Sequence, residues 1–304
     1  MQNERGMQMT CVSPLLGATE KGTATALAES PLKQGLLYVG TDDGALWCTK
    51  DGGREWQRID QNLPTSESLY VSDIVPSHFK TDRVYVTLDG HRSDDFATHV
   101  LLSEDCGATW YDLGETLPGR AVCHAFAEDP RNEDLLFLGT EHGCWASLDR
   151  GYNWLRLKNG LPNSSVRELV IQDRDSDLVA ATHGRGILIL DIEGLRQLTE
   201  RVSKKAAHLF EVQPAYLWKM TSRGFQGHKN YRANNPAYGV TFHLWHQAEP
   251  EQEPVLTIHD ITGKEIAEVT GEKVAGMQVL QWSTRKGRSL MPPGTYSVRL
   301  AGDE

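Results

Sequence analysis

The sequence predicts an all-β protein in which one short pattern recurs three times. Residues 49–56 (TKDGGREW), 103–110 (SEDCGATW) and 147–154 (SLDRGYNW) each place a hydroxyl residue two before an Asp, a Gly two after it and a Trp five after it. The composition agrees, because 28 Gly and 13 Pro among 304 residues suit many short strands joined by turns. No run of residues approaches the roughly 18 apolar positions of a membrane helix, so no membrane span is expected.

The repeated pattern has the chemistry of a tight turn between two strands. The Asp carboxylate can accept backbone N–H bonds inside the turn, and the Gly supplies the positive φ that closes it. The Trp can fold its ring back over the turn and bury a large apolar area. We expect the Asp, Gly and Trp of every copy to be structural: Asp51, Gly53, Trp56, Asp105, Gly107, Trp110, Asp149, Gly151 and Trp154.

The repeat extends beyond the turns into units of several strands. A β-rich run precedes each turn, at residues 36–41, 83–87 and 135–140, and another strand precedes that run, as at residues 26–31. A fourth unit, residues 166–192, has three such strands and then stops without the turn. Units of several strands that recur at intervals of roughly 40–50 residues predict the blades of a β-propeller, about four of them here.

The turns match the Asp-box pattern, and the chain resembles the last propeller blades of large bacterial Asp-box proteins of the sortilin-like or glycosyl-hydrolase-like type. The resemblance runs from about residue 26 to residue 300, and it also rests on residues 88–96 (LDGHRSDDF) and 181–192 (ATHGRGILILDI). Glu55 and Asn153 replace the usual Thr of the pattern at a variable turn position. The resemblance implies a fold and little chemistry, because the family label follows the propeller repeats and not a reaction.

The chain divides into four predicted parts. Residues 1–22 are a leader or the remnant of a preceding blade, and residues 23–193 hold the blades. Residues 194–207 are predicted to form a connecting helix, because apolar residues recur there at spacings of three and four. Residues 208–304 show seven short strand patterns and resemble an Ig-like β-sandwich of the flagellar-hook-cap type, with an exposed loop at residues 221–235.

Four blades make an incomplete propeller. A blade cannot bury both of its faces without neighbours, so the first blade would keep an apolar face exposed. We therefore expect the chain to be a fragment of a longer protein, or a late start within one, whose missing blades are its partners. Expressed alone, it is expected to aggregate or to dimerise through residues 26–41.

Composition excludes several kinds of partner. The formal net charge of −10 argues against nucleic acid, because phosphate binding needs a basic footprint. Five cysteines cannot all pair and lack zinc spacing, so we expect unpaired thiols, no metal and no cofactor. Residues 1–10 are polar and do not resemble a signal peptide, while the full-length protein is expected to be extracellular or periplasmic.

The candidate site lies on the loops between the second and third strands of the blades. In such a blade these loops open toward the central channel, opposite the repeated turns, and the loop of the second unit is the longest. Long loops on a rigid scaffold are where function concentrates. The candidate ligand-binding residues on these loops are Asp89, His91, Arg92, Asp94, Glu141, His142, His183 and Arg185.

Two classes of function remain open. In the first, the chain is a non-catalytic extracellular module of a larger multidomain protein and binds a polysaccharide or a protein through these loops. In the second, it is a fragment of a glycoside hydrolase of the Asp-box endoglucanase or sialidase type, in which Asp89 or Asp94 would face Glu141 across a cleft. No catalytic residue is assigned, and a polar recognition loop is favoured over catalysis.

Overall fold

The computed structural model describes residues 22–65, 68–158, 160–216, 238–286 and 289–301. The chain falls into two compact units, Met1–Arg196 and Gln197–Glu304. The predicted leader at residues 1–22 lies almost wholly outside the described residues. None of the helices in the described ranges is long and apolar enough to cross a membrane.

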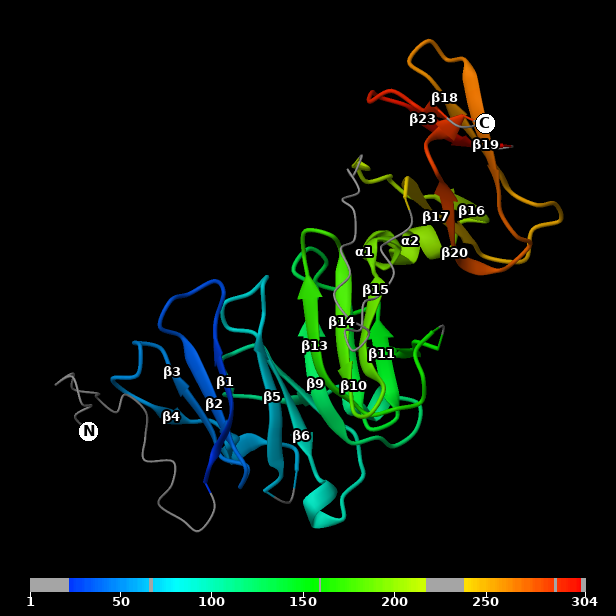
Figure 1. Cartoon of the computed structure of the whole chain (residues 1–304). Helices are drawn as coiled ribbons and strands as arrows, with labels where there is room; N and C mark the ends of the chain where they lie inside the picture. The colour runs from blue at the N-terminus through cyan, green and yellow to red at the C-terminus, as the bar shows by residue number, and fades with distance from the viewer. Residues whose placement is uncertain (1–21, 66–67, 159, 217–237, 287–288, 302–304) are drawn as a thin grey trace, which may run out of the picture. The chain divides into compact units, whose positions relative to one another are not determined.

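The first unit contains successive antiparallel sheets in which each strand pairs with the next along the chain (Figure 1). The four-stranded sheets are β1 (Ala24–Glu29), β2 (Leu37–Thr41), β3 (Leu46–Thr49) and β4 (Gln57–Arg58); β5 (Tyr70–Pro76), β6 (Val84–Asp89), β7 (His99–Ser103) and β8 (Tyr111–Asp112); and β9 (Cys123–Glu128), β10 (Leu136–Thr140), β11 (Gly143–Ser147) and β12 (Leu155–Arg156). The last sheet has three described strands, β13 (Val166–Gln172), β14 (Asp177–Thr182) and β15 (Gly186–Asp191). The predicted all-β chain with repeated four-stranded units is confirmed.

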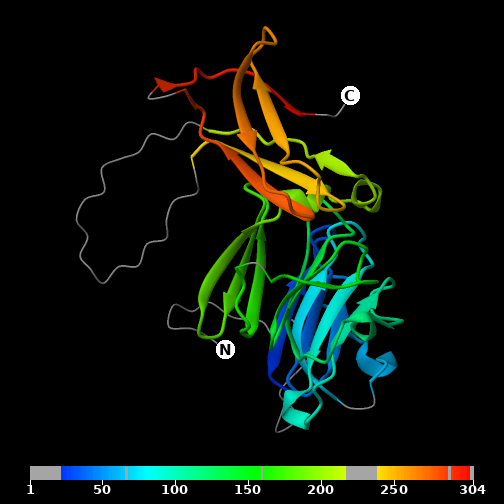
Figure 2. The ribbon, with the colours of Figure 1, turned by 90° about the vertical axis from the view of Figure 1, so that its right-hand side faces the viewer.

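The sheets follow one another as the blades of a propeller do. The first strand of each sheet contacts the first strand of the next, so β1, β5, β9 and β13 are the inner strands. Figure 2 shows β13, β14 and β15, in green, as a sheet beside the blue and cyan ones. Short 3₁₀ helices, η1 (Asp60–Asn62), η2 (His91–Ser93) and η3 (Gly114–Thr116), lie in the connections.

Three apolar clusters fill the spaces between successive blades. The cluster between the second and third blades includes Tyr85 and Phe126, whose rings stack with centroids 4.7 Å apart. Tyr38 lies in the cluster between the first and second blades, and Phe137 in the one between the third and fourth. Because the middle blades bury both faces, β6 and β9 are buried along almost their whole length and show no alternation of buried and exposed residues.

The repeated turns fold as their chemistry predicts. In the second turn, Asp105 Oδ1 accepts the N–H of Thr109 at 2.8 Å and the hydroxyl of Ser103 at 2.8 Å. Ser103 Oγ in turn accepts the N–H of Gly107 at 2.7 Å, and the φ of Gly107 is 88°. The same contacts recur in the other two turns.

Two of the turn tryptophans also hold neighbouring blades together. Trp110 Nε1 donates to the carbonyl oxygen of Ile59 at 3.0 Å, and Trp154 Nε1 donates to that of Leu113 at 3.3 Å, each in the preceding blade. Trp56 Nε1 donates within its own turn at 3.2 Å. The N–H groups of Trp110 and Trp154 therefore bridge two blades, a contact that the turn pattern alone does not predict.

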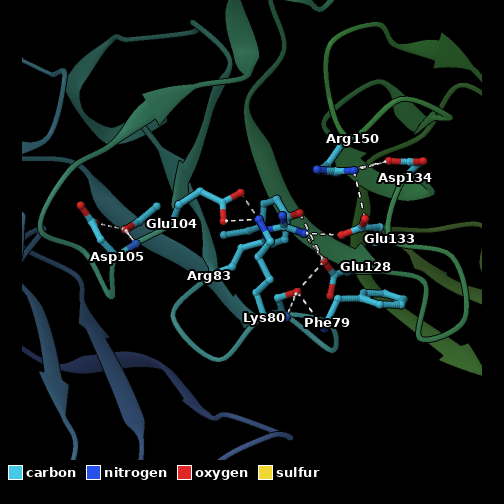
Figure 3. A network of polar contacts seen from close by, with 12 residues as sticks. Phe79, Lys80, Arg83, Glu104, Asp105, Glu128, Glu133, Asp134 and Arg150 are labelled. Atoms are coloured by element: carbon cyan, nitrogen blue, oxygen red, sulfur yellow. Dashed lines mark hydrogen bonds and ion pairs between the residues drawn. The ribbon is translucent and has the colours of Figure 1, made fainter.

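A buried ion cluster joins the second and third blades near the turns (Figure 3). The Arg83 side chain is fully buried; its Nε donates to Glu104 Oε1 at 2.9 Å and its Nη1 to Glu133 Oε2 at 3.2 Å. Glu128 Oε1 lies 3.9 Å from Arg83 Nη1 and accepts the hydroxyl of Tyr85 at 3.2 Å. Arg83, Glu104, Glu128 and Glu133 are called the Arg83 cluster below.

Two short helices follow the last blade, where the sequence predicts one helix over residues 194–207. They are α1 (Glu193–Gln197) and α2 (Glu200–Ser203). Thr199 Oγ1 accepts the N–H of Val202 at 3.3 Å and so caps the start of α2. A hydroxyl side chain that satisfies a free N–H favours a helix start at this point, and the single predicted helix is divided there.

The second unit is a pair of small sheets around one core. The first sheet is β16 (Ala207–Leu209), β17 (Val240–His246) and β20 (Gly276–Trp282); the second is β19 (Glu265–Thr270), β18 (Val255–His259) and β23 (Ser297–Leu300); β21 (Arg285–Lys286) pairs with β22 (Ser289–Leu290). Leu244 and Trp282 of the first sheet share an apolar cluster with Leu256 and Ile258 of the second. The predicted loop at residues 221–235 lies outside the described residues.

The cysteines in the described ranges are buried and unpaired, as predicted. They are Cys48, Cys106, Cys123 and Cys144, while Cys11 lies outside the described residues. Burial raises the pKa of the Cys48 thiol to about 11 and that of Cys144 to about 12. Thiols of this kind stay protonated at neutral pH and act as small apolar side chains.

Candidate functional site

Each inner strand contains a β-bulge near its start. The pairing with the second strand skips one residue in every blade: Thr25 in β1, Ser72 in β5, His124 in β9 and Arg167 in β13. A bulge leaves the extra residue out of the ladder and turns its side chain away from the regular alternation. These four residues, called the bulge residues below, therefore occupy equivalent positions in the four blades.

Three bulge residues reach toward the next inner strand. Thr25 Oγ1 donates to a backbone carbonyl of β5 at 2.8 Å, and Ser72 Oγ donates to one of β9 at 3.0 Å. His124 Nδ1 lies 3.2 Å from Arg167 Nη1. A row of polar contacts consequently runs from blade to blade along the inner strands.

His124 is the centre of a charged cluster at the end of this row. Its Nε2 lies 2.9 Å from Glu141 Oε2, and its Nδ1 lies 3.4 Å from Asp89 Oδ2. Arg167 Nη2 lies 3.5 Å from the same Glu141 oxygen. Because Asp89 ends β6 and Glu141 follows β10, three different blades contribute to the cluster.

A hollow opens beside the imidazole. It is lined by Tyr70, Ser72, Asp89, Arg92, His124 and Arg167, and these residues with Glu141 are called the His124 site below. The guanidinium of Arg92 lies 4.8 Å from the centre of the Tyr70 ring, a cation–π contact. The lining offers both donors and acceptors, as a polyhydroxylated or otherwise polar ligand requires.

Both carboxyl groups of the His124 site are held ionised. Burial opposes the ionisation of Asp89, yet hydrogen bonds from His124 and the backbone N–H of His91 leave its pKa below the usual range. The hydrogen bond with His124 lowers the pKa of Glu141, against partial burial and with help from the Arg167 charge. A glycosidase acid needs a carboxyl whose pKa is raised, and neither of these two carboxyls has one.

A different inner-strand carboxyl does have a raised pKa. Burial raises the pKa of Asp73 in β5 to about 6, against the hydrogen bond from Phe126 and with a contribution from the negative charge of Glu168. Asp73 Oδ2 accepts the N–H of Phe126 in β9 at 2.9 Å, and Oδ1 accepts the N–H of Ile74 at 2.8 Å. Asp73 and Glu168 both line a second hollow between the inner strands.

The structure brings some of the predicted site residues together and leaves the others apart. Asp89, Arg92 and Glu141 belong to the His124 site. The remaining candidates are exposed and do not line its hollow: His91, Asp94, His142, His183 and Arg185. No group of three or more His, Cys, Asp or Glu side chains in the described part of the chain could hold a metal ion.

Sequence reasoning missed the residues of the site that lie on strands. These are Tyr70, Ser72, His124 and Arg167. The sequence predicts a site on loops, and a bulge residue on a strand has no sequence signature of its own. A sequence signal for these residues does exist in the repeat: the same position of each unit is occupied by Thr25, Ser72, His124 and Arg167.

The fold and the site together define a protein built of β-propeller blades, and its sequence is similar to part of known xyloglucanases. It is 27% identical over 140 residues to the xyloglucanase Xgh74A of Acetivibrio thermocellus and 26% identical over 145 residues to a xyloglucanase of a Paenibacillus species. Each match covers 42% of this chain but only 16% and 14% of the relatives' own lengths. No protein-family model matches the chain.

Solved structures give weaker likenesses. The GH74 xyloglucanase of Xanthomonas campestris matches with a TM-score of 0.47 and 13% identity, over 84% of this chain and 45% of that one. YCF48 of Cyanidioschyzon merolae matches with a TM-score of 0.40 and 18% identity, over 58% of this chain and 54% of that one. The assignment of propeller blades rests on the strand order within each sheet and on the contacts between inner strands.

Proposed function

We propose that the chain is an Asp-box propeller module that binds a polysaccharide, or a polar protein surface, at the His124 site and does not cleave it. The observation that carries the proposal is the convergence of three blades on one polar hollow whose lining includes a buried imidazole. A polysaccharide is the favoured ligand, since the sequence relatives are xyloglucanases. In this proposal the module belongs to a larger extracellular protein, and residues 208–304 are an Ig-like sandwich beside it.

The state of the carboxyls supports the proposed absence of cleavage. Glycoside hydrolysis requires one protonated carboxyl as acid and a second, ionised one across the scissile bond. In the His124 site, Asp89 and Glu141 are both ionised and both contact His124, which lies between them. Such a site can recognise hydroxyl groups, and neither of its carboxyls holds a proton to give a leaving group.

The second candidate function is a glycoside hydrolase of the endoglucanase type. Two observations favour it: the relatives are xyloglucanases, and the pKa of Asp73 is raised to about 6, near that of a working acid. Against it, both oxygens of Asp73 already accept backbone N–H groups. In the pair of Asp89 with Glu141, which the sequence offers, the pKa values of both carboxyls are lowered.

A binding and hydrolysis screen distinguishes the two functions. The chain is titrated with xyloglucan and with other neutral and acidic polysaccharides by calorimetry, and reducing ends are measured in parallel. Arg92→Ala and Arg167→Ala should each weaken binding by about tenfold or more, because each removes a charged donor from the hollow. Arg185→Ala, which removes an exposed arginine outside the hollow, is the matched control and should bind as the wild type does.

The contrary results are equally distinct. Binding that survives both Arg92→Ala and Arg167→Ala would place the ligand elsewhere on the molecule. Hydrolysis by the wild type that disappears in Glu141→Gln, Asp94→Asn or Asp73→Asn would replace the binding function by the hydrolase.

A further inference from the structure

One face of the fourth sheet is apolar and exposed. Val170 in β13 pairs with Val179 in β14, which pairs with Ile189 in β15, and Ile187 lies on the same face. The exposed fractions are 54% for Val170, 66% for Ile189 and 70% for Ile187. In the described residues no strand pairs with the outer edge of β15. Contiguous apolar side chains on one sheet face mark an interaction surface, whereas scattered ones do not.

The strand-pairing register shows that this exposed face is equivalent to a face that is buried in each of the other blades. Counted from the bulge residue, the cross-strand triplet Val170–Val179–Ile189 is equivalent to Ala28–Tyr38–Cys48, Val75–Tyr85–Leu102 and Ala127–Phe137–Ala146. Each of those three triplets packs in the apolar cluster that its blade shares with the next blade. The fourth triplet therefore has the position of an inter-blade contact without a following blade among the described residues.

Polar groups at the inner edge of this face repeat the same arrangement. In β5, Ser72 donates to a carbonyl of β9, and the next residue, Asp73, accepts the N–H of Phe126 in β9. The same two positions in β13 are Arg167 and Glu168, again a donor followed by an acceptor. Both are exposed, and Arg167 has N–H groups beyond those that face His124 and Glu141.

The chain carries the complementary surface on its own first blade. Ile74, Phe126 and Leu169 are equivalent residues of β5, β9 and β13 that pack in the cluster shared with the preceding blade. Their equivalent in β1 is Leu27, which is 73% exposed. Since Leu27 and Ile187 are both exposed, the first and fourth blades do not pack against each other within one molecule.

We infer that the exposed face of β13, β14 and β15 binds the first blade of a second copy of this chain, head to tail. The contact repeats the three inter-blade contacts inside each molecule: an apolar triplet meets Leu27, and Arg167 and Glu168 bond the backbone of β1. Residues 26–41, through which the sequence predicts association, form the first-blade side of this contact. Because the two surfaces differ, the contact is heterologous, and copies add in one direction until a ring closes.

Sedimentation velocity of the full chain over a range of concentrations tests this inference. The wild type should form dimers or larger species. Leu27→Asp, and separately the double variant Ile187→Asp with Ile189→Asp, should each weaken association by at least about tenfold. Ile261→Asp changes a residue that is 88% exposed in the second unit and should behave as the wild type.

Mixing the variants separates a head-to-tail contact from other modes. The Leu27 variant keeps the fourth-blade face and the double variant keeps the first-blade face, so an equimolar mixture should form a heterodimer that neither forms alone. Leu27→Ser and Ile189→Ser repeat the test with smaller changes, and circular dichroism checks that each variant is folded. A wild type that is monomeric throughout, or a Leu27→Asp variant that still dimerises, overturns the inference.

Discussion

The Arg83 cluster and the His124 site lie at opposite ends of β6 and use the same kinds of side chain for different purposes. In the Arg83 cluster, the side chains of Arg83 and Glu128 are fully buried. In the His124 site only the imidazole is buried, whereas 40% of the Glu141 side chain and 50% of the Arg167 side chain are exposed. At the first end the central Arg83–Glu128 pair is enclosed by protein, with the partly exposed Glu104 and Glu133 at its margin, whereas at the other end the ion pair of Glu141 with Arg167 faces solvent.

The number of internal partners explains what each end can do. Glu128 accepts hydrogen bonds from Ser77 Oγ at 2.8 Å, from the N–H of His78 at 2.6 Å and from Tyr85, so both of its carboxylate oxygens are bonded within the protein. A buried charge of this kind holds two blades together, and its loss leaves its partners unpaired. Arg92 and Arg167 present their donors to an open hollow. Solvent access, and not residue type, separates the structural end from the proposed binding end.

The largest expected effect comes from breaking the buried end. Glu128→Ala should lower the free energy of unfolding by about 3–5 kcal/mol, because Arg83 loses a buried partner and three donors lose their acceptor. Urea denaturation followed by tryptophan fluorescence measures the change. Glu115→Ala removes an exposed carboxylate near the same blade and should cost less than about 0.5 kcal/mol. Equal losses of stability in Glu128→Ala and Glu115→Ala would show that burial of the carboxylate does not decide its contribution.

An intermediate effect is expected from Asp73, which lies between the two ends of β5. Its pKa is about 6 in the folded chain against an ordinary value of 3.8, so the folded state binds the extra proton between those values. Stability contributed by this group is present at low pH and is lost as pH rises through about 6. Asp73→Asn should remove roughly 3 kcal/mol of this pH dependence, measured by urea denaturation at pH values on either side of the window. An unchanged slope would show that Asp73 does not titrate there.

The smallest effect is expected at the open end. Arg167→Gln should change the free energy of unfolding by no more than about 1 kcal/mol, because the ion pair with Glu141 is half exposed. The Arg167 charge helps to lower the pKa of Glu141, so this part of the stability is present at neutral pH and lost as pH falls through the folded value. The variant should therefore lose less stability on acidification than the wild type does. A destabilisation as large as that of Glu128→Ala would make the His124 site structural.

The repeats were predictable from sequence, while their contacts were not. The turns of Asp51, Asp105 and Asp149 follow from local hydrogen bonding, which depends on residues only a few positions apart. The roles of Trp110 and Trp154 depend on which blade lies beside them, and a single turn does not contain that information. The length of the loop in the second unit led to Asp89 and Arg92, and the equivalent loop of the third unit led to Glu141. Finding His124 required the pairing register of β9 with β10, since a bulge shifts the alternation by one residue.

The bulge in each inner strand places a variable polar residue near a position that must stay apolar for the sheets to pack. Three residues after the bulge, every blade keeps an apolar residue: Ala28, Val75, Ala127 and Val170. At the bulge itself the four blades carry a threonine, a serine, a histidine and an arginine. A duplicated blade can thus acquire a new recognition group by a change in one codon, while the positions that stack the sheets stay as they were inherited.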